Sequence, residues 1–296
     1  MQNVIEKLLI SHNPTSKRAF TKAVKEFSDG YIKHERIDLG KTHINCILYN
    51  AYKEPEYTDD IFLYFNGRAT HLYTLLKCMD RIVFMQGLSD HGSILIFDYV
   101  RIKNNPFHKY SVNFDTIIDD FVHYRNFLVS KNINISKMSV IGFSLGSIFA
   151  SRFTHFLVEQ KKFPKQLVLI GSIWQIDRVI LQNYHLYHML YLKIHENVRD
   201  NIEKRYNCYV LLDVSGKVPI KIVHGQFDET LTMGYALHMH ELVDSSLLIV
   251  KGSHQELPCE EICQFIINRQ DILQDSDEGS NLSETPSIGS IGSVEN

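Results

Sequence analysis

The sequence predicts an α/β protein built on a mostly parallel, doubly wound sheet with helices on both faces. From residue 61 onward, short apolar segments of strand length alternate with helical patterns of about 12–16 residues. This alternation is typical of parallel sheets that are covered on both sides. The chain has 296 residues, 44% of them hydrophobic, which is enough for one domain of roughly 250 residues with its own core and additional tails.

The first strands are expected at residues 31–38 and 43–49, which alternate polar and apolar side chains and form an antiparallel hairpin at the sheet edge. The later strands are expected as continuous apolar runs at 61–65, 93–97, 138–141, 166–170, 220–223 and 247–250. Helical periodicity predicts helices at 73–86, ended by Gly87, and at 114–129, about 147–160 and 233–242.

Three segments fall outside this alternation. Residues 1–30 carry apolar positions at helical spacing, and we expect two flanking helices that Asn13-Pro14 separates. Within the main domain, residues 31–273, a Tyr- and His-rich insertion at 173–216 is expected to form a small helical lid. Residues 274–296 are acidic and Ser-rich with few large apolar side chains, so we expect a disordered tail.

Composition and charge exclude several classes of function. The net charge of -3 argues against nucleic-acid binding, which needs a basic face. No apolar run approaches the ~18 residues of a transmembrane helix, and no secretory signal is visible at the start of the chain. The five cysteines are scattered and odd in number, which predicts free thiols and a cytoplasmic protein. The tail composition leaves export into a host cell through a C-terminal signal as the alternative.

The residues that bear the chemistry begin in the segment 138–147, where an expected strand runs into the turn Gly142-Phe143-Ser144-Leu145-Gly146. A G-x-S-x-G turn between a strand and a helix lifts the serine hydroxyl above the sheet, and the glycines remove side chains that would clash across the turn. The N-terminus of the following helix then points at Ser144 and can stabilise an oxyanion. Ser144 is therefore the expected nucleophile.

A serine nucleophile needs a base, and the base needs an acid that orients it. Asp228 follows the strand at 220–223, and His254 follows the strand at 247–250, so the chain order is serine, acid, histidine. We expect Asp228 and His254 to fill these roles. Glu229 is the alternative acid, and His238 and His240 are less suitable bases because they lie inside an expected helix.

The oxyanion hole is expected to use two backbone N–H groups. One belongs to Leu145, directly after the nucleophile, and the other is expected from Arg68, in the loop after the strand at 61–65. Asn66 is expected to brace that loop and to contact the substrate, together with Phe143 of the elbow.

These motifs resemble those of serine hydrolases of the α/β-hydrolase superfamily. They are Leu63–Gly67, Ile96–Tyr99, Gly142–Gly146, His224–Asp228 and Gly252–His254, and the resemblance covers about residues 31–270. Among the branches, the sequence is most similar to the Bem46-like and monoacylglycerol-lipase-like group. The chain departs from that group at Asn66, where a histidine is usual, and after Asp98-Tyr99, where two expected glycines are missing.

The resemblance implies hydrolysis of an ester, thioester or amide through an acyl-enzyme, without metal or cofactor. The insertion at 173–216 stands where the family has a lid, and Tyr187, Met189 and Tyr191 are expected to contact a small, hydrophobic acyl substrate. No carboxylate or Cys spacing accompanies His185, His188 and His195, so no metal site is expected. Acyl transfer to another acceptor and a non-catalytic, partner-binding role remain alternatives, and the oligomeric state is open.

Overall fold

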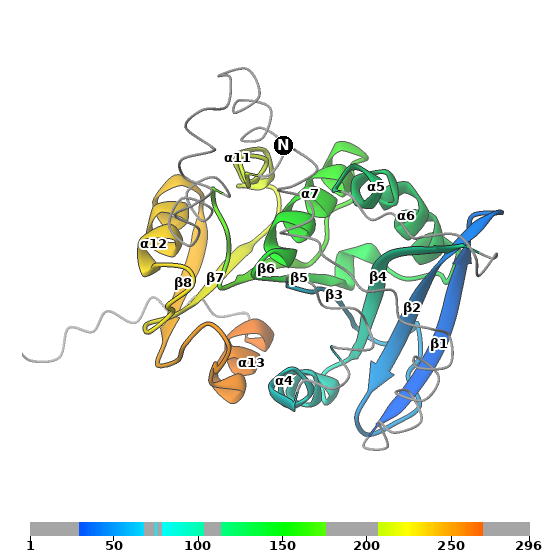
Figure 1. Cartoon of the computed structure of the whole chain (residues 1–296), viewed down its shortest axis with the longest axis horizontal. Helices are drawn as coiled ribbons and strands as arrows, with labels where there is room; N and C mark the ends of the chain where they lie inside the picture. Colours follow the sequence, from blue (N-terminus) through cyan, green and yellow to red (C-terminus); the bar gives the residue numbers. More distant parts are fainter. Residues whose placement is uncertain (1–29, 68–74, 76–78, 104–113, 176–206, 269–296) are drawn as a thin grey trace, which may run out of the picture.

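The computed structural model describes residues 30–67, 75, 79–103, 114–175 and 207–268. Within these residues, eight strands form one sheet in the order β1-β2-β4-β3-β5-β6-β7-β8 (Figure 1). The strands are β1 (Tyr31–Asp38), β2 (Thr42–Asn50), β3 (Ile61–Phe65), β4 (Ser93–Lys103), β5 (Ser139–Phe143), β6 (Gln166–Ile170), β7 (Ile220–Gly225) and β8 (Ser245–Val250).

The helices alternate with the parallel strands along the chain. They are α4 (Met79–Ser89), α5 (Phe114–Asp119), α6 (Phe121–Ser130), the 3-10 turn η1 (Ile135–Lys137), α7 (Gly146–Glu159), α11 (Leu211–Val214), α12 (Met233–Leu242) and α13 (Cys259–Ile267). In Figure 1, α4 and α13 cover one face of the sheet, and α5, α6 and α7 cover the other.

Strand direction confirms the expected mixed sheet. β1 and β2 form the antiparallel hairpin at one edge, with Tyr31 opposite Asn50, and β2 also runs antiparallel to β4. All remaining neighbours, from β4 through β3 to β8, are parallel. The carboxyl ends of β3, β5, β6, β7 and β8 therefore meet at one edge of the sheet, which we call the carboxyl edge.

Two apolar cores explain why the central strands are continuous hydrophobic runs. Every residue of β3, β5 and β6 is buried, and successive side chains point to opposite faces. Tyr64 thus packs in the core under α4 and α13, whereas its neighbour Phe65 packs with Phe121 and Phe153 under α6 and α7.

Several predicted boundaries were wrong, and three of them have a clear explanation or consequence in the structure. β4 extends past Phe97 to Lys103, because its second half continues to pair with β2, with Lys103 opposite Thr42. The helix expected at 114–129 is divided at Asp120, which the structure buries and pairs with Arg101 at 2.7 Å. α4 continues through Gly87 to Ser89 instead of ending there.

The position of Gly87 has a packing reason. A Cβ atom at this residue would lie 2.9 Å from the Sγ of Cys263 in α13, so the missing side chain lets the two helices approach closely. Lys221 of β7 fixes the C-terminal end of α13. The Lys221 Nζ donates to the carbonyl oxygens of Phe265 at 2.6 Å and Asn268 at 2.7 Å, which satisfies carbonyls that the helix end leaves unpaired.

Several predictions lie outside the described residues. These are the flanking helices within 1–29, the central part of the insertion, 176–206, and the tail. Of the insertion, residues 173–175 and 207–216 are described, and among them Ile173, Trp174 and Cys208 are buried.

Among the helices in the described ranges, none combines the length and apolar character that crossing a bilayer requires.

Candidate active site

Ser144 occupies a sharp turn between β5 and α7. Its φ of 50° lies in the left-handed region that non-glycine residues rarely adopt, and its N–H donates to the carbonyl of Ile170 in β6 at 2.9 Å. A Cβ atom at Gly142 would lie 2.6 Å from the carbonyl oxygen of Gly146. The turn therefore needs glycine on both sides of the serine, as the G-x-S-x-G motif predicts.

Gly146 has a further role because it touches the end of β3. A Cβ atom there would overlap the carbonyl oxygens of Phe65 and Asn66. The start of α7 can therefore pack directly on the chain that leaves β3. This contact brings the loop with Asn66 and Gly67 beside Ser144, and a Cβ atom at Gly67 would lie 3.3 Å from that of Ser144.

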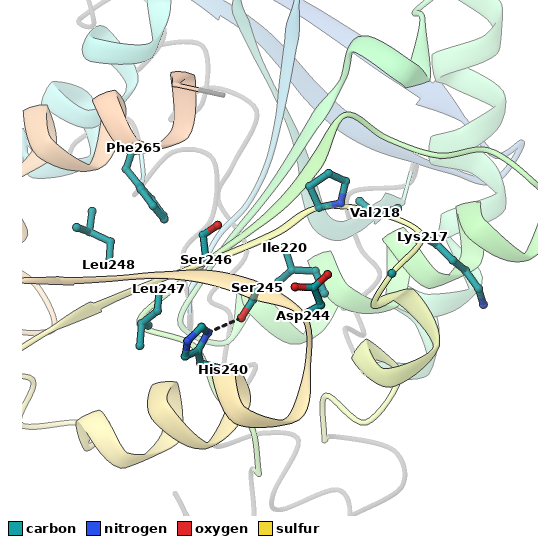
Figure 2. A pocket seen from close by; sticks show the side chains of 12 residues that line it. Lys217, Val218, Ile220, His240, Asp244, Ser245, Ser246, Leu247, Leu248 and Phe265 are labelled. Carbon is teal, nitrogen blue, oxygen red and sulfur yellow. Dashed lines mark hydrogen bonds between the residues drawn. The ribbon is translucent and has the colours of Figure 1, made fainter. Parts of the chain in front are cut away.

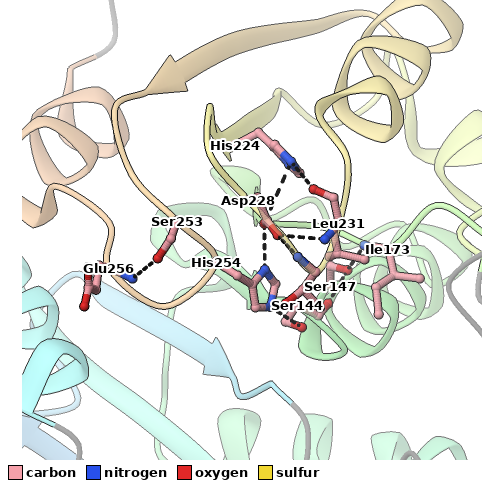
Figure 3. Close-up of polar contacts among 10 residues, drawn as sticks. Ser144, Ser147, Ile173, His224, Asp228, Leu231, Ser253, His254 and Glu256 are labelled. Carbon is pink, nitrogen blue, oxygen red and sulfur yellow. Dashed lines mark hydrogen bonds and ion pairs between the residues drawn. The ribbon is translucent and has the colours of Figure 1, made fainter. Parts of the chain in front are cut away.

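The structure brings Ser144, His254 and Asp228 together at the carboxyl edge (Figure 3). The His254 Nε2 lies 3.0 Å from the Ser144 Oγ, and its Nδ1 lies 2.7 Å from the Asp228 Oδ2. These three residues come from the loops after β5, β8 and β7. His254 and Ser144 are 3% and 8% exposed, so their hydrogen bond lies in surroundings of low polarity, where electrostatic interactions are strong.

The Asp228 carboxylate is held on both oxygens. While Oδ2 faces His254, Oδ1 accepts from the backbone N–H groups of Thr230 at 2.9 Å and Leu231 at 2.7 Å. Burial alone would raise the pKa of Asp228, but the bonds from His254 and Leu231 hold it below its ordinary value. Asp228 is therefore a carboxylate at neutral pH and can stabilise a protonated His254.

The expected oxyanion donors are only partly described. Leu145 directly precedes α7, is buried, and its N–H finds no acceptor within the described ranges of the chain. An N–H group without an acceptor, beside Ser144 at the start of a helix, can donate a hydrogen bond to a negatively charged oxygen. Arg68 lies outside the described residues.

Asn66 and Phe143 lie beside the three residues. The backbone carbonyl of Asn66 accepts from the Tyr99 hydroxyl at 2.8 Å, and its buried side-chain Oδ1 has no partner among the residues that the structure describes. Phe143 is buried, and its ring centroid lies 5.2 Å from that of His254. The structure thus places the His254 imidazole against an aromatic ring. Tyr187, Met189 and Tyr191, the other expected substrate contacts, lie outside the described residues.

The alternative acid and bases are elsewhere. Glu229 is exposed. His238 faces Trp174 with ring centroids 6.0 Å apart, and the His240 Nδ1 lies 3.0 Å from the Ser245 Oγ. None of these side chains contacts Ser144.

Sequence reasoning missed two residues that shape the site. Gly171 follows β6 with a φ of 50°, and a Cβ atom there would lie 3.3 Å from Cε1 of His254. Ser147 is buried, and its Oγ donates to the Ser144 carbonyl at 2.6 Å and accepts from the Ile173 N–H at 3.1 Å. The position of Gly171 directly after a predicted strand could have indicated its place at the site. The bridging role of Ser147 depends on tertiary contacts and has no such signal.

The buried cysteines among the described residues are poor alternative nucleophiles. Cys46, Cys208, Cys259 and Cys263 are free thiols. Burial raises the pKa of Cys208 to about 12 and that of Cys263 to about 12. Because the thiolate is the reactive form, these two side chains are poor nucleophiles at neutral pH.

A cavity of about 740 Å³ lies far from the three residues, at the amino ends of β7 and β8 (Figure 2). Its lining includes Lys217, His240, Asp244 and Ser245. It contains polar groups, but within the described lining no serine is hydrogen-bonded to a histidine and a carboxylate in series. In the described part of the chain, no cluster of His, Cys, Asp and Glu is arranged to hold a metal ion.

Comparisons with known proteins identify the fold. No family model matches the sequence, and no curated protein matches it. Solved structures do match: an arylesterase (TM-score 0.54, 14% identity, 90% of this chain and 85% of that chain) and Est1E from Butyrivibrio proteoclasticus (0.57, 13%, 79% and 95%). An alpha-beta hydrolase from Vibrio vulnificus gives 0.59 at 10% identity, covering 88% of each chain. The chain has the α/β-hydrolase fold, as predicted, and the Bem46-like and monoacylglycerol-lipase-like branch stays a prediction.

Proposed function

We propose that this protein is a serine hydrolase that cleaves a carboxylic ester or thioester through an acyl-enzyme intermediate. The observation that carries the proposal is the unbroken series of hydrogen bonds from Ser144 through His254 to Asp228, at 3.0 and 2.7 Å. This series has the geometry of a nucleophile, a general base and an orienting acid. Such residues on an α/β sheet belong at the carboxyl edge, which is where these three lie.

Acylation begins when His254 Nε2 takes the proton of Ser144 as its Oγ attacks the substrate carbonyl. The carboxylate of Asp228 accepts the Nδ1–H of His254, which fixes the tautomer and stabilises the positive ring that forms. His254 then gives the proton to the leaving alcohol or thiol. Water attacks the acyl-enzyme in the second half of the reaction, with His254 again as the base.

The negative charge that develops on the carbonyl oxygen needs preorganised donors. The Leu145 N–H is one donor, because it is unpaired within the described residues and adjoins the nucleophile. The second proposed donor is the N–H of Arg68, which follows Gly67 in the sequence, and the support for it is the closeness of Gly67 to Ser144, since an added Cβ atom at Gly67 would lie 3.3 Å from that of Ser144.

The substrate class follows from the surroundings and from the structural neighbours. Proteins that share the fold are described as an arylesterase and as esterases, which supports an ester as the substrate. The aromatic ring of Phe143 beside His254 supports an apolar acyl group. The lid residues Tyr187, Met189 and Tyr191 are proposed to complete this contact.

A fluorophosphonate probe and a series of p-nitrophenyl esters of rising acyl length test the proposal. The wild-type protein should be labelled once per chain and hydrolyse the esters, with an optimum chain length that reports the acyl site. Ser144→Ala should lose labelling and about 10⁴- to 10⁶-fold of turnover. Ser245→Ala, at the cavity near the amino ends of the strands, is the matched control and should behave as wild type.

Ester turnover that survives in Ser144→Ala would rule out this nucleophile. A wild-type protein that neither reacts with the probe nor turns over any ester in the series would contradict the enzymatic function itself. Labelling and an acyl burst, followed by steady turnover only when an alcohol or amine acceptor is added, would indicate that the acyl group passes to that acceptor instead of water.

A further inference from the structure

A second buried histidine lies on the other side of the catalytic acid. His224 is in β7, four residues before Asp228, and its side chain is 0% exposed. Its Nε2 lies 2.8 Å from the carbonyl oxygen of Leu231 and 3.8 Å from the Asp228 Oδ2. Figure 3 shows His224 and His254 on opposite sides of Asp228. The mechanism above gives His224 no task.

The Leu231 peptide connects His224 to the catalytic carboxylate. The N–H of Leu231 donates to the Asp228 Oδ1 at 2.7 Å, and the carbonyl of the same residue faces the His224 ring. The turn from Asp228 to Leu231 is therefore held at both its ends, at Asp228 by the carboxylate itself and at Leu231 by the imidazole. Movement of Leu231 would change the orientation of the Asp228 oxygens.

The charge and tautomer of His224 follow from its surroundings. Burial lowers the pKa of His224, and this outweighs the bond to the Leu231 carbonyl and the nearby Asp228. The neutral ring has one N–H, and the acceptor at 2.8 Å takes it. The proton is therefore on Nε2, and Nδ1 is a buried acceptor without a partner in the described residues.

This unpaired Nδ1 shows that packing alone does not account for a histidine here. A buried acceptor without a partner costs free energy, and an apolar side chain of similar shape would avoid that cost. What a phenylalanine or leucine cannot supply is the N–H for the Leu231 carbonyl.

We propose that His224 is a positioning residue for catalysis: its Nε2–H holds the Leu231 carbonyl and thereby keeps the turn that presents the Asp228 carboxylate to His254. This proposal rests on the function proposed above. When His254 is protonated during each half-reaction, its new charge is stabilised by the Asp228 Oδ2, and that contribution depends on the carboxylate being held in one orientation. His224 acts through Asp228 and touches neither the substrate nor the reacting atoms.

The test compares His224→Gln with His224→Phe in the full chain. A glutamine side chain reaches far enough for its amide N–H to replace the Nε2–H, whereas phenylalanine fills the space without a donor. We expect His224→Phe to lower kcat for a p-nitrophenyl ester by about 10- to 100-fold, with KM changed less than about twofold, since only the transition state loses stabilisation. The rate of fluorophosphonate labelling at Ser144 should fall in parallel, and His224→Gln should recover most of both rates.

Two further measurements keep the outcome decisive. Thermal unfolding of both variants shows that the protein assayed is folded. Nitrogen-15 NMR of the wild-type His224 ring reports its tautomer, without any variant, and should place the proton on Nε2.

A proton on Nδ1, a wild-type kcat in His224→Phe, or a His224→Gln variant as slow as His224→Phe would each overturn the positioning role. If wild-type protein reacts with the probe while His224→Phe reacts equally fast, only this inference fails. If the wild-type protein neither reacts with the probe nor hydrolyses esters, the proposed function fails and the positioning role with it.

Discussion

The two ends of the parallel strands differ in a way that cavity size does not reveal. At the amino ends of β7 and β8 there is a cavity of about 740 Å³ with Lys217, His240, Asp244 and Ser245 in its wall. At the carboxyl edge, buried polar side chains are joined in series, from Ser144 through His254 and Asp228 to the Leu231 peptide and His224.

Both ends contain serine, histidine and acidic residues, so residue type alone does not separate them. The difference is in connection and burial: Ser144 and His254 are nearly inaccessible, whereas the contact between His240 and Ser245 is exposed. Polar groups that are desolvated and hydrogen-bonded to one another in sequence can move a proton and stabilise charge. Matched substitutions at the two ends of the strands test this difference.

The largest contrast is expected between two aspartates. Asp228→Asn should lower kcat by about 10⁴-fold, because an amide cannot stabilise a positive imidazole and can favour the wrong tautomer. Asp244→Asn, at the amino ends, should leave kcat at the wild-type value. Steady-state hydrolysis of a p-nitrophenyl ester measures both, and comparable losses in the two variants would remove the distinction between the ends.

Two glycines give the next contrast. Gly146→Ala should cost about 4 kcal/mol or more of folding free energy, because the new methyl group would overlap backbone atoms of Phe65 and Asn66. Gly216 has a φ of 74° and no atom within 4 Å of an added Cβ, so Gly216→Ala should cost only about 1–2 kcal/mol of conformational strain. Urea unfolding measures both values, and a fully stable Gly146→Ala would show that the elbow does not pack as described.

A smaller effect is expected at Ser147. Ser147→Ala removes the hydroxyl that bridges the Ser144 carbonyl and the Ile173 N–H, and a buried N–H without a partner costs about 1–3 kcal/mol. The loss should appear in thermal unfolding, together with a fall in kcat of about tenfold or less. Because Ser144 keeps its φ through the other contacts of the turn, complete inactivation would contradict this account.

The smallest effect is on the pH dependence of stability. His224 has a folded-state pKa below its ordinary value of 6.5, so below pH 6.5 the unfolded chain binds a proton that the folded chain does not. Stability therefore falls as pH falls from about 6.5 toward the folded-state pKa. Relative to its own Tm at pH 7.5, His224→Gln should lose less Tm than wild type at pH 5.5, which thermal unfolding at the two pH values measures. An identical loss in both proteins would mean that His224 does not titrate differently on folding.

Much of the fold could be predicted because local patterns determine it. Fully buried strands such as β3, β5 and β6 read as continuous apolar runs, and the bounds of β1, β6 and α12 agree with the structure. The ends of β4 and α4 were wrong because tertiary contacts decide them, namely pairing with β2 and the approach of Cys263 to Gly87.

The candidate site divides in the same way. Ser144, Asp228 and His254 could be proposed because each follows a recognisable strand end, and a parallel sheet gathers such ends at one edge. The roles of Ser147 and His224 could not be predicted, because each depends on a single hydrogen bond that forms only in the folded chain. Ser147 bonds to the Ile173 N–H, and His224 bonds to the Leu231 carbonyl. No local pattern indicates which carbonyl a buried imidazole will face.

The anchoring of α13 by Lys221 has a practical consequence. Lys221 is near the start of β7, so its bonds to Phe265 and Asn268 fix residue 268 at the side of the domain away from Ser144. β7 has six residues, so the two sides are separated by about 20 Å of strand. A fluorescent label or affinity tag introduced just after Asn268 is therefore attached remote from Ser144, which makes this a suitable site for immobilising the protein during labelling experiments.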